Sequence, residues 1–331
     1  MKDILSKLFE HKTLSRSEAK DSLLSICRGE INATQIASFI TVFQMRSISV
    51  PELAGFRDAM LEVCLPVNVS EYNAIDVCGT GGDGKNTFNI STLSAFVAAG
   101  AGVYVTKHGN YAVSSASGSS NVLEYAGVKF TNDLSKIKNS LEKSGVAVLH
   151  APLFHPAMKN VAPIRKDLGF KSFFNILGPT INPAMPQKQL SGVFNLELTR
   201  MYGHLFYDVF DRFAIIHSLD GYDEISLTSP FKMITHESDS LLNSEDLGLK
   251  TYNQEELFGG NSIPESFEIF TKIISGNGTD AQNQVLIANA AVAIWVSIAN
   301  KSLMECVSLA EESLKSLKAK KSFDTFLTLN S

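Results

Sequence analysis

The sequence predicts an α/β protein in two parts: a small all-helical N-terminal part, then a larger α/β part with a mostly parallel central sheet. Residues 1–65 place apolar residues at helical spacing with almost no strand-like alternation. After Pro66, short apolar runs alternate with helical segments, which is typical of a parallel sheet. The length of 331 residues and the 44% hydrophobic content agree with about two globular domains.

The N-terminal part carries helix-start signals as well as helical spacing. Its apolar positions gather in the runs 4–9 and 23–27. Ser15 precedes Glu18 in the spacing of a capping box. Residues 49–52 (SVPE) place a proline in the first turn of a helix. We therefore expect several short helices here.

The second part shows four short apolar runs bounded by polar residues. The predicted strands are 74–78, 103–106, 146–149 and 213–217. Polar loops or turns are expected at 236–248 and 275–283. The apolar run 285–299 contains Asn289 and is too short for a bilayer span, so it predicts a buried helix. Prolines concentrate in 151–187, which indicates a crossing between domains.

The overall charge and the cysteines exclude some classes of partner. A formal net charge of -5 and a pI near 5.8 leave no excess of Lys and Arg to neutralise phosphates. We therefore expect neither a nucleic-acid partner nor a membrane surface. The 4 cysteines are scattered without a Cys-x-x-Cys pair, and the N-terminus lacks an apolar signal segment. Both features favour a cytoplasmic protein with reduced thiols.

The glycine-rich run at 76–92, DVCGTGGDGKNTFNIST, matches two phosphate-binding signatures. From Gly79 to Gly84 it fits the dinucleotide pattern Gly-x-Gly-x-x-Gly. From Gly79 to Lys85 it nearly fits the P-loop. The P-loop match fails because Asn86 stands where that motif needs a metal-binding hydroxyl.

The dinucleotide match fails at the next strand. An acidic residue should end that strand and hold ribose hydroxyls, but Lys107 and His108 stand there instead. Basic residues such as Lys107 and His108 beside a glycine loop favour a site that binds pyrophosphate without the adenosine part of a dinucleotide. Asn89, Ser91 and Thr92 open the following helix and add polar groups at a natural anion site. The alternative is a loop whose glycines only make a tight turn.

A second loop, residues 107–127, also follows a strand and leads into a helix. Gly109 suits a close approach of the backbone to a ligand. Ser115, Ser117 and Ser119 place hydroxyls near a helix start. A serine-rich surface loop is the alternative.

The segment 149–184 carries candidates for binding an organic acid. It combines His150, His155 and Arg165 with apolar residues and prolines. The guanidinium of Arg165 has the donor geometry that suits a carboxylate. A structural role for His150 and an ion pair between Arg165 and Asp167 are the alternatives.

Two adjacent acids, Asp223 and Glu224, follow a glycine turn after the strand predicted at 213–217. At the carboxyl end of a strand, two such acids are placed to hold Mg²⁺, which is the partner that a pyrophosphate requires. A solvated turn is the alternative.

Six motifs follow one another along the chain. They are GTGGD at 79–83, NIST at 89–92, KHGN at 107–110, HPAMKNVAPIRKDLG at 155–169, FNILGPTINPA at 174–184 and GYDE at 221–224. Together they resemble the anthranilate phosphoribosyltransferase family of tryptophan biosynthesis. The resemblance implies a helical domain at 1–68, completed by a segment returning near 160–187 and packed on an α/β domain at 69–331. It also implies a homodimer through the helical domain.

The resemblance further implies a reaction. The phosphoribosyl group of 5-phosphoribosyl 1-pyrophosphate (PRPP) passes to the amine of anthranilate, which gives N-(5-phosphoribosyl)anthranilate and pyrophosphate, the second step of tryptophan synthesis from chorismate. Two Mg²⁺ ions per subunit are implied. An enzyme similar to pyrimidine nucleoside phosphorylases, or a catalytically silent relative that binds nucleic acid, is the alternative.

The resemblance assigns roles to individual residues. Those expected to bind PRPP are Gly79, Gly82, Asp83, Thr87, Asn89, Ile90, Ser91, Thr92, Lys107 and Ser119. Those expected to line the anthranilate path are Gly79, His108, Asn110, His155, Arg165 and Gly178. Those expected to serve Mg²⁺ are Ser91, Asp223 and Glu224, and the general base is unknown. One position departs from the family pattern, because Tyr111 follows KHGN where Arg is common.

Overall fold

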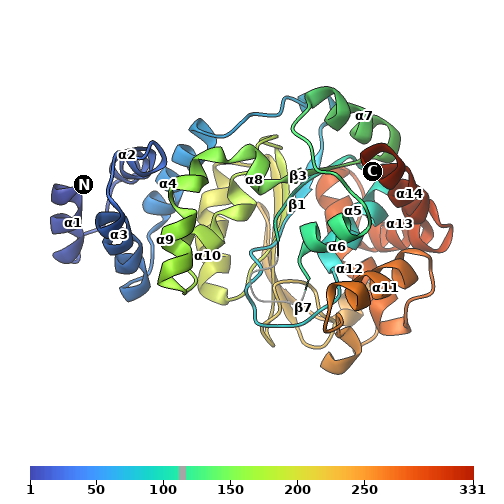
Figure 1. Cartoon of the computed structure of the whole chain (residues 1–331). Coiled ribbons are helices and arrows are strands. Elements are labelled where there is room, and N and C mark those ends of the chain that lie inside the picture. The colour runs from blue at the N-terminus through green and yellow to red at the C-terminus, as the bar shows by residue number, and fades with distance from the viewer. Residues whose placement is uncertain (112–116) are drawn as a thin grey trace.

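The computed structural model describes residues 1–111 and 117–331 as a central sheet between two layers of helices (Figure 1). The sheet has seven strands in the order β3-β2-β1-β4-β5-β6-β7. The pairs from β3 to β5 are parallel, while β5–β6 and β6–β7 are antiparallel. This arrangement confirms the predicted fold class.

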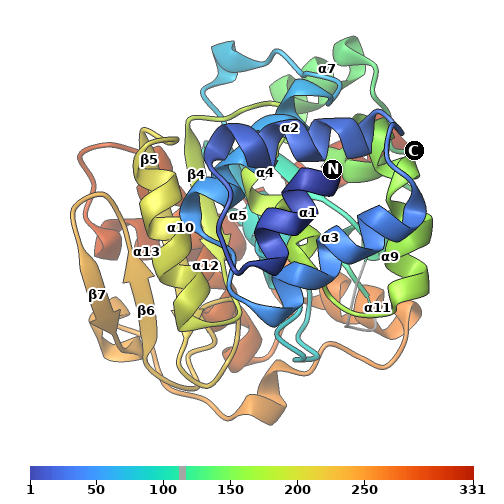
Figure 2. The same ribbon diagram turned by 90° about the vertical axis from the view of Figure 1, so that its left-hand side faces the viewer.

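The N-terminal part is helical, as predicted. Its helices are α1 (Lys2–Phe9), α2 (Arg16–Cys27), α3 (Ala33–Met45) and α4 (Val50–Glu62). Figure 2 shows them gathered in front of the sheet, with α10 beside them. Their apolar faces share one core with α10 and with one face of strand β5.

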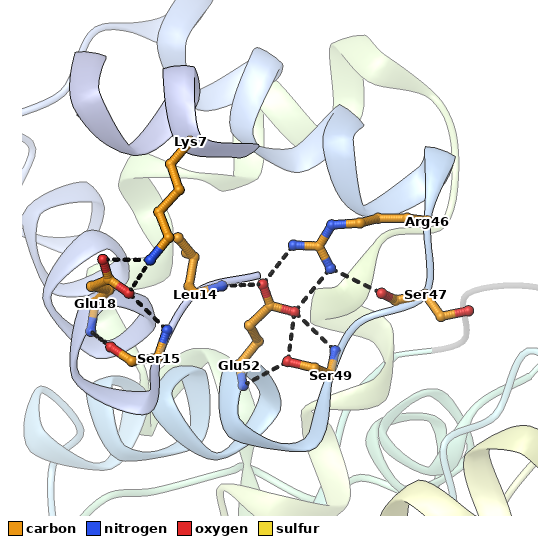
Figure 3. Close-up of polar contacts among 8 residues, drawn as sticks. All are labelled: Lys7, Leu14, Ser15, Glu18, Arg46, Ser47, Ser49 and Glu52. Atoms are coloured by element: carbon orange, nitrogen blue, oxygen red, sulfur yellow. Dashed lines mark hydrogen bonds and ion pairs between the residues drawn. The ribbon is translucent and has the colours of Figure 1, made fainter. Parts of the chain in front are cut away.

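Two capping boxes organise this helical unit (Figure 3). Ser15 and Glu18 cap α2, and Ser49 and Glu52 cap α4. Glu52 is 0% exposed and also binds the guanidinium of Arg46 and the amide of Leu14. Burial acts to raise the pKa of Glu52, but the hydrogen bonds from Arg46 and two amides outweigh it and hold that pKa below its ordinary value. The buried carboxylate of Glu52 therefore holds the N-terminal ends of α2 and α4 next to each other.

The strands correct several sequence predictions. They are β1 (Ile75–Val77), β2 (Val105–Gly109), β3 (Val146–His150), β4 (Lys188–Gly192), β5 (Arg212–Ser218), β6 (Phe231–Ile234) and β7 (Asp239–Leu242). Lys107 and His108 lie inside β2 rather than after its end. Strands β4, β6 and β7 were not predicted, and β7 lies in a segment expected to be a loop. This edge strand has only four residues, two of them polar, and all four are at least partly exposed, so its apolar signal is weak.

A second layer of helices covers the opposite face of the sheet. It contains α5 (Ile90–Gly100), α6 (Ser119–Tyr125), α11 (Ile263–Ile274), α12 (Asp280–Ser297), α13 (Leu303–Lys315) and α14 (Lys318–Asn330). Helix α7 (Leu134–Ser144) packs instead at the β3 edge of the sheet, where Ile137 and Leu141 share a small separate core with Ala147 and Leu149. Helix α12 is buried on most sides, as predicted, and Asn289 within it bonds the backbone of Ile225. Within the described ranges, no helix combines the length and apolarity that a membrane crossing requires.

The segment between β3 and β4 returns to the N-terminal helices. It contains α8 (Ala151–Phe154), α9 (Ala162–Leu168) and short 3-10 turns, and α10 (Leu196–Tyr207) follows β4. Phe173 in this segment stacks on Phe56 with ring centroids 4.5 Å apart and contacts Phe39 and Phe43 edge-on. The aromatic cluster holds the segment against the helical unit. The domain boundary at 68/69 stays a prediction.

Candidate active site

A cavity of about 740 Å³ opens where the parallel strands β1, β2, β3 and β5 end. The glycine loop after β1 and the acid pair after β5 line one part of it. Residues of α9 and the following 3-10 turns line another part. Ligands of open α/β sheets bind at this edge because the loops after parallel strands converge there.

The glycine loop has a backbone that few other residues adopt. Gly81, Gly82 and Gly84 have φ values of +62, +79 and +76°. At Gly79 the constraint is space, because a Cβ there would lie 2.8 Å from the Oδ2 atom of Asp223. The lysine of the P-loop match, Lys85, lies 4.6 Å from the centroid of the Tyr222 ring. The loop thus presents backbone to the cavity.

The acid pair lies inside the cavity rather than on a solvated turn. The amide of Gly81 donates to Oδ2 of Asp223 at 2.7 Å, and the amide of Ser91 donates to Oε1 of Glu224 at 3.0 Å. Burial, followed by the negative charge of Asp83, raises the pKa of Asp223 to about 7. Burial, followed by the charges of Asp223 and Asp83, raises the pKa of Glu224 well above its ordinary value. The charge of Lys107 acts in the opposite direction on Glu224, but burial and the neighbouring acids outweigh it.

These carboxylates fit a divalent cation. Carboxylate oxygens are the ligands that Mg²⁺ prefers, and a bound cation would relieve the mutual repulsion that raises their pKa values. Among the described residues, no three His, Cys, Asp or Glu side chains form a complete metal-ligand group. Mg²⁺ commonly takes its remaining ligands from water and substrate phosphates.

Lys107 is buried beneath the glycine loop. It is 2% exposed, and its Nζ donates to the carbonyl of Val77 at 2.6 Å and to Oγ of Ser91 at 3.2 Å. Ser91 and Thr92 lie in the first turn of α5, whose N-terminus carries partial positive charge. A cation beside a helix start is an anion site.

Asn89 and Ser119 connect the two loops. The side-chain amide of Asn89 donates to the carbonyl of Ser117 at 3.0 Å, and the Ser119 hydroxyl donates to the carbonyl of Asn110 at 3.2 Å. A Cβ at Gly109 would lie 2.9 Å from Oγ of Ser119. The predicted anion-binding residues of both loops thus line one cavity, together with Thr87 and Ile90.

Two neutral histidines line the other end. His108 bonds the carbonyl of Gly178 through Nδ1 at 3.0 Å, so that nitrogen donates and Nε2 carries a lone pair. The rings of His108 and His155 lie 5.2 Å apart. Burial lowers the pKa of His108 to about 4 and the pKa of His155 to about 3. Both rings are therefore uncharged at neutral pH.

Arg165 projects from α9 into this end of the cavity. Its guanidinium lies 5.1 Å from the ring centroid of Phe174 and donates to Oδ1 of Asn175 at 3.3 Å. Within the part of the chain that the structure describes, it forms no ion pair, so the alternative of pairing with Asp167 is not observed. Burial lowers the pKa of Arg165, but guanidinium remains charged in proteins. An unpaired, partly buried cation is suited to a ligand carboxylate.

Not every predicted residue belongs to the cavity. His150 bonds Oγ of Ser120 at 2.9 Å and stacks on Phe130 at 4.5 Å, so its role is structural. Tyr111 lines the cavity rim and contacts the His150 ring. Ser115 lies outside the described residues.

Sequence reasoning missed Gly192, the last residue of β4. A Cβ there would lie 1.4 Å from the carbonyl oxygen of Asp223. Only glycine therefore leaves room for the backbone of the turn that carries the acid pair. Its signal was hidden because β4 itself was not recognised as a strand. Asp76, 0% exposed, was also missed; its carboxylate accepts from the amide of His108 at 3.0 Å.

Comparisons with known proteins agree with this geometry. Residues 71–320 match the α/β domain of a glycosyl transferase family, and residues 2–64 match the helical bundle domain of the same family. An anthranilate phosphoribosyltransferase of Flavobacterium johnsoniae is 58% identical over 322 residues, which cover 96% of this chain and 97% of the relative.

Two solved structures share the whole architecture. The anthranilate phosphoribosyltransferase of Thermus thermophilus superposes with a TM-score of 0.92 at 31% identity, covering 98% of both chains. The enzyme of Saccharomyces cerevisiae in complex with PRPP and Mg superposes with a TM-score of 0.89 at 27% identity, covering 98% of this chain and 96% of that one. The ordered motifs, the fold and these similarities lead to one conclusion: the chain belongs to the anthranilate phosphoribosyltransferase family.

Proposed function

We propose that this protein transfers the phosphoribosyl group of PRPP to the amine of anthranilate, giving N-(5-phosphoribosyl)anthranilate and pyrophosphate, the second step of tryptophan synthesis from chorismate. The observation that carries the proposal is that one cavity is lined by two chemically different groups of residues. The glycine loop, Lys107 and the acid pair form an end suited to Mg²⁺-bound phosphates, whereas Arg165 and two neutral histidines form an end suited to a small aromatic acid.

The proposed roles follow this division. PRPP contacts Gly79, Gly82, Asp83, Thr87, Asn89, Ile90, Ser91, Thr92, Lys107 and Ser119. Anthranilate contacts Gly79, His108, Asn110, His155, Arg165 and Gly178. Ser91, Asp223 and Glu224 hold Mg²⁺, for which we propose two ions per subunit.

The chemistry is a displacement at C1 of the ribose. The bond between C1 and pyrophosphate breaks, a bond from the anthranilate nitrogen to C1 forms, and one amine proton is released. Bound Mg²⁺ supplies positive charge for the departing pyrophosphate. The glycine-loop amides and Lys107 hold the phosphates, and Arg165 orients the acceptor so that its amine faces C1.

No residue is assigned as general base. An arylamine is neutral at pH 7 and carries the lone pair that attacks. His108 and His155 have lowered pKa values, which makes them weak bases, and their neutral rings suit the aromatic body of the acceptor.

The assembly and location are also proposals. We propose a homodimer through the helical domain, residues 1–68, and a cytoplasmic location. The segment 160–187 completes that domain, and packing of Phe173 and Phe174 with the N-terminal helices supports this assignment. Residues 69–331 then form the PRPP-binding domain.

The test is a fluorescence assay. Anthranilate fluorescence should fall when the protein, PRPP and Mg²⁺ are mixed, and should stay constant if any one of them is omitted. Constant fluorescence in the full mixture would contradict the proposal. Release of free base from a pyrimidine nucleoside in phosphate would instead identify a nucleoside phosphorylase.

A further inference from the structure

Lys171 connects the segment that carries Arg165 to the glycine loop. Its Nζ donates to the carbonyl of Gly82 at 2.7 Å, although 89 positions separate the two residues in the chain. Gly82 lines the cavity, and a Cβ there would lie 3.4 Å from the same Nζ. Lys171 is therefore not itself a lining residue of the cavity, but its ammonium group lies directly against a loop residue that is.

The backbone around Lys171 is held firmly on one side. Helix α9 ends at Leu168, and Gly169 follows it with a φ of +68°, a left-handed conformation that stops the helix. The amide of Ser172 donates to Oδ1 of Asn175 at 2.9 Å, and Phe173 is anchored by stacking on Phe56. The backbone that carries the Lys171 ammonium group is therefore fixed to the helical unit only two residues away, at Phe173.

The present partner of Lys171 leaves its charge uncompensated. A backbone carbonyl is neutral, and among the described residues Lys171 forms no ion pair. The neighbouring amide of Gly81 donates to Asp223, so Gly82 lies beside the acids proposed to hold Mg²⁺. An ammonium group held against this loop is a point charge of the kind that binds phosphate oxygens.

We propose that Lys171 is a further ligand of the PRPP diphosphate, exchanging the Gly82 carbonyl for a phosphate oxygen when the donor binds. This inference rests on the proposed function. It gives the segment 160–187 two roles, since Arg165 serves the acceptor and Lys171 serves the donor. Charge-assisted contact with the diphosphate would also draw the two sides of the cleft together.

The test uses Mg²⁺ and inorganic pyrophosphate as the probe, titrated calorimetrically into the whole protein. Lys171→Met should weaken pyrophosphate binding about tenfold at low salt, and by less at high salt because the contact is exposed. Lys171→Arg should retain most of the affinity. Lys166→Met, an exposed lysine of α9, is the matched control and should bind as the wild type does.

Two results would overturn the inference. Unchanged pyrophosphate affinity in Lys171→Met would mean that Lys171 does not bind the anion and only holds the Gly82 carbonyl. An equal loss of pyrophosphate and anthranilate affinity would point to a displaced segment rather than a lost phosphate contact. Turnover by the wild type is measured separately: its absence would refute the proposed reaction, while the pyrophosphate titrations still decide whether Lys171 binds the anion.

Discussion

At the scale of single residues, the charged groups of the site have mostly neutral partners. Among the described residues, Arg165 contacts an amide oxygen and an aromatic face rather than an acid, and the carboxylates of Asp223 and Glu224 accept backbone amides. Ligand binding to such groups costs little free energy, because no strong ion pair has to be broken first. Their substitution should therefore affect ligands more than folding.

Arg165→Ala is expected to raise the Michaelis constant for anthranilate roughly ten- to a hundred-fold and to leave that for PRPP nearly unchanged. A charge-assisted hydrogen bond lost from a partly buried site costs on the order of 1.5–3 kcal/mol. Steady-state kinetics with each substrate varied in turn would measure this. An equal rise in both constants would contradict the assignment and indicate a displaced domain segment.

Asp223→Asn and Glu224→Gln are expected to lower turnover and to raise the Mg²⁺ concentration needed for half-maximal rate. Each amide keeps the shape of the acid and an oxygen for the backbone donor but removes the charge. Asp220→Asn is the control, because Asp220 does not line the cavity and its carboxylate accepts from the hydroxyl groups of Thr228 and of Ser229, the latter at 2.7 Å. Unchanged Mg²⁺ dependence in both acid variants would show that Asp223 and Glu224 do not bind the metal.

At the scale of elements, the end of one strand sets the position of a loop. Strand β4 pairs with both β1 and β5, so its last residue lies between the glycine loop and the acid-bearing turn. The carbonyl of Gly192 accepts from the amide of Thr80, and its Cα faces the carbonyl of Asp223. A side chain at this point has no room.

Gly192→Ala is expected to lower kcat/KM on the order of a hundred-fold. The added Cβ would stand 1.4 Å from the Asp223 carbonyl oxygen, so the turn must move, and a displacement of about 1 Å at a reacting site costs about this factor. Gly203→Ala in α10 is the control, because its Cβ would meet only two side-chain carbons of Ile234, the nearer at 3.4 Å. Kinetics and thermal unfolding of both variants would test this, and wild-type activity in Gly192→Ala would refute it.

At the scale of the whole molecule, burying neutral histidines makes stability depend on pH. An unfolded histidine has a pKa near 6.5, whereas burial lowers the pKa of His155 to about 3. Below 6.5 the unfolded chain therefore binds more protons than the fold, so stability is lost as the pH falls from that value toward the folded pKa. His108, with a pKa of about 4, acts in the same direction.

His155→Gln should reduce this loss of stability. Between about pH 7.5 and about pH 5.5, one fully buried neutral histidine lowers the free energy of unfolding by about 1.4 kcal/mol. Denaturant titrations at both values should show a drop smaller by about that amount in the variant than in the wild type. Equal drops would mean that His155 is protonated as readily in the fold as in the unfolded chain.

The fold class, the capping box of α2, the buried helix α12 and the motifs that line the cavity all follow from the sequence alone. These features depend on local patterns: the periodicity of apolar residues, the spacing of Ser and Glu, and short motifs that each stand at one strand end. Four of the seven strands were found for the same reason, because each is a short apolar run.

Which of these residues meet follows only from the tertiary structure. Among the described residues, it places His150 against Ser120 and pairs Arg165 with an amide rather than an acid. It also places Lys171 on Gly82 and Gly192 under Asp223. The physical reason is that most of these contacts join residues far apart in the chain. Their distance depends on how the sheet and the returning segment pack, and no local pattern of residues records it.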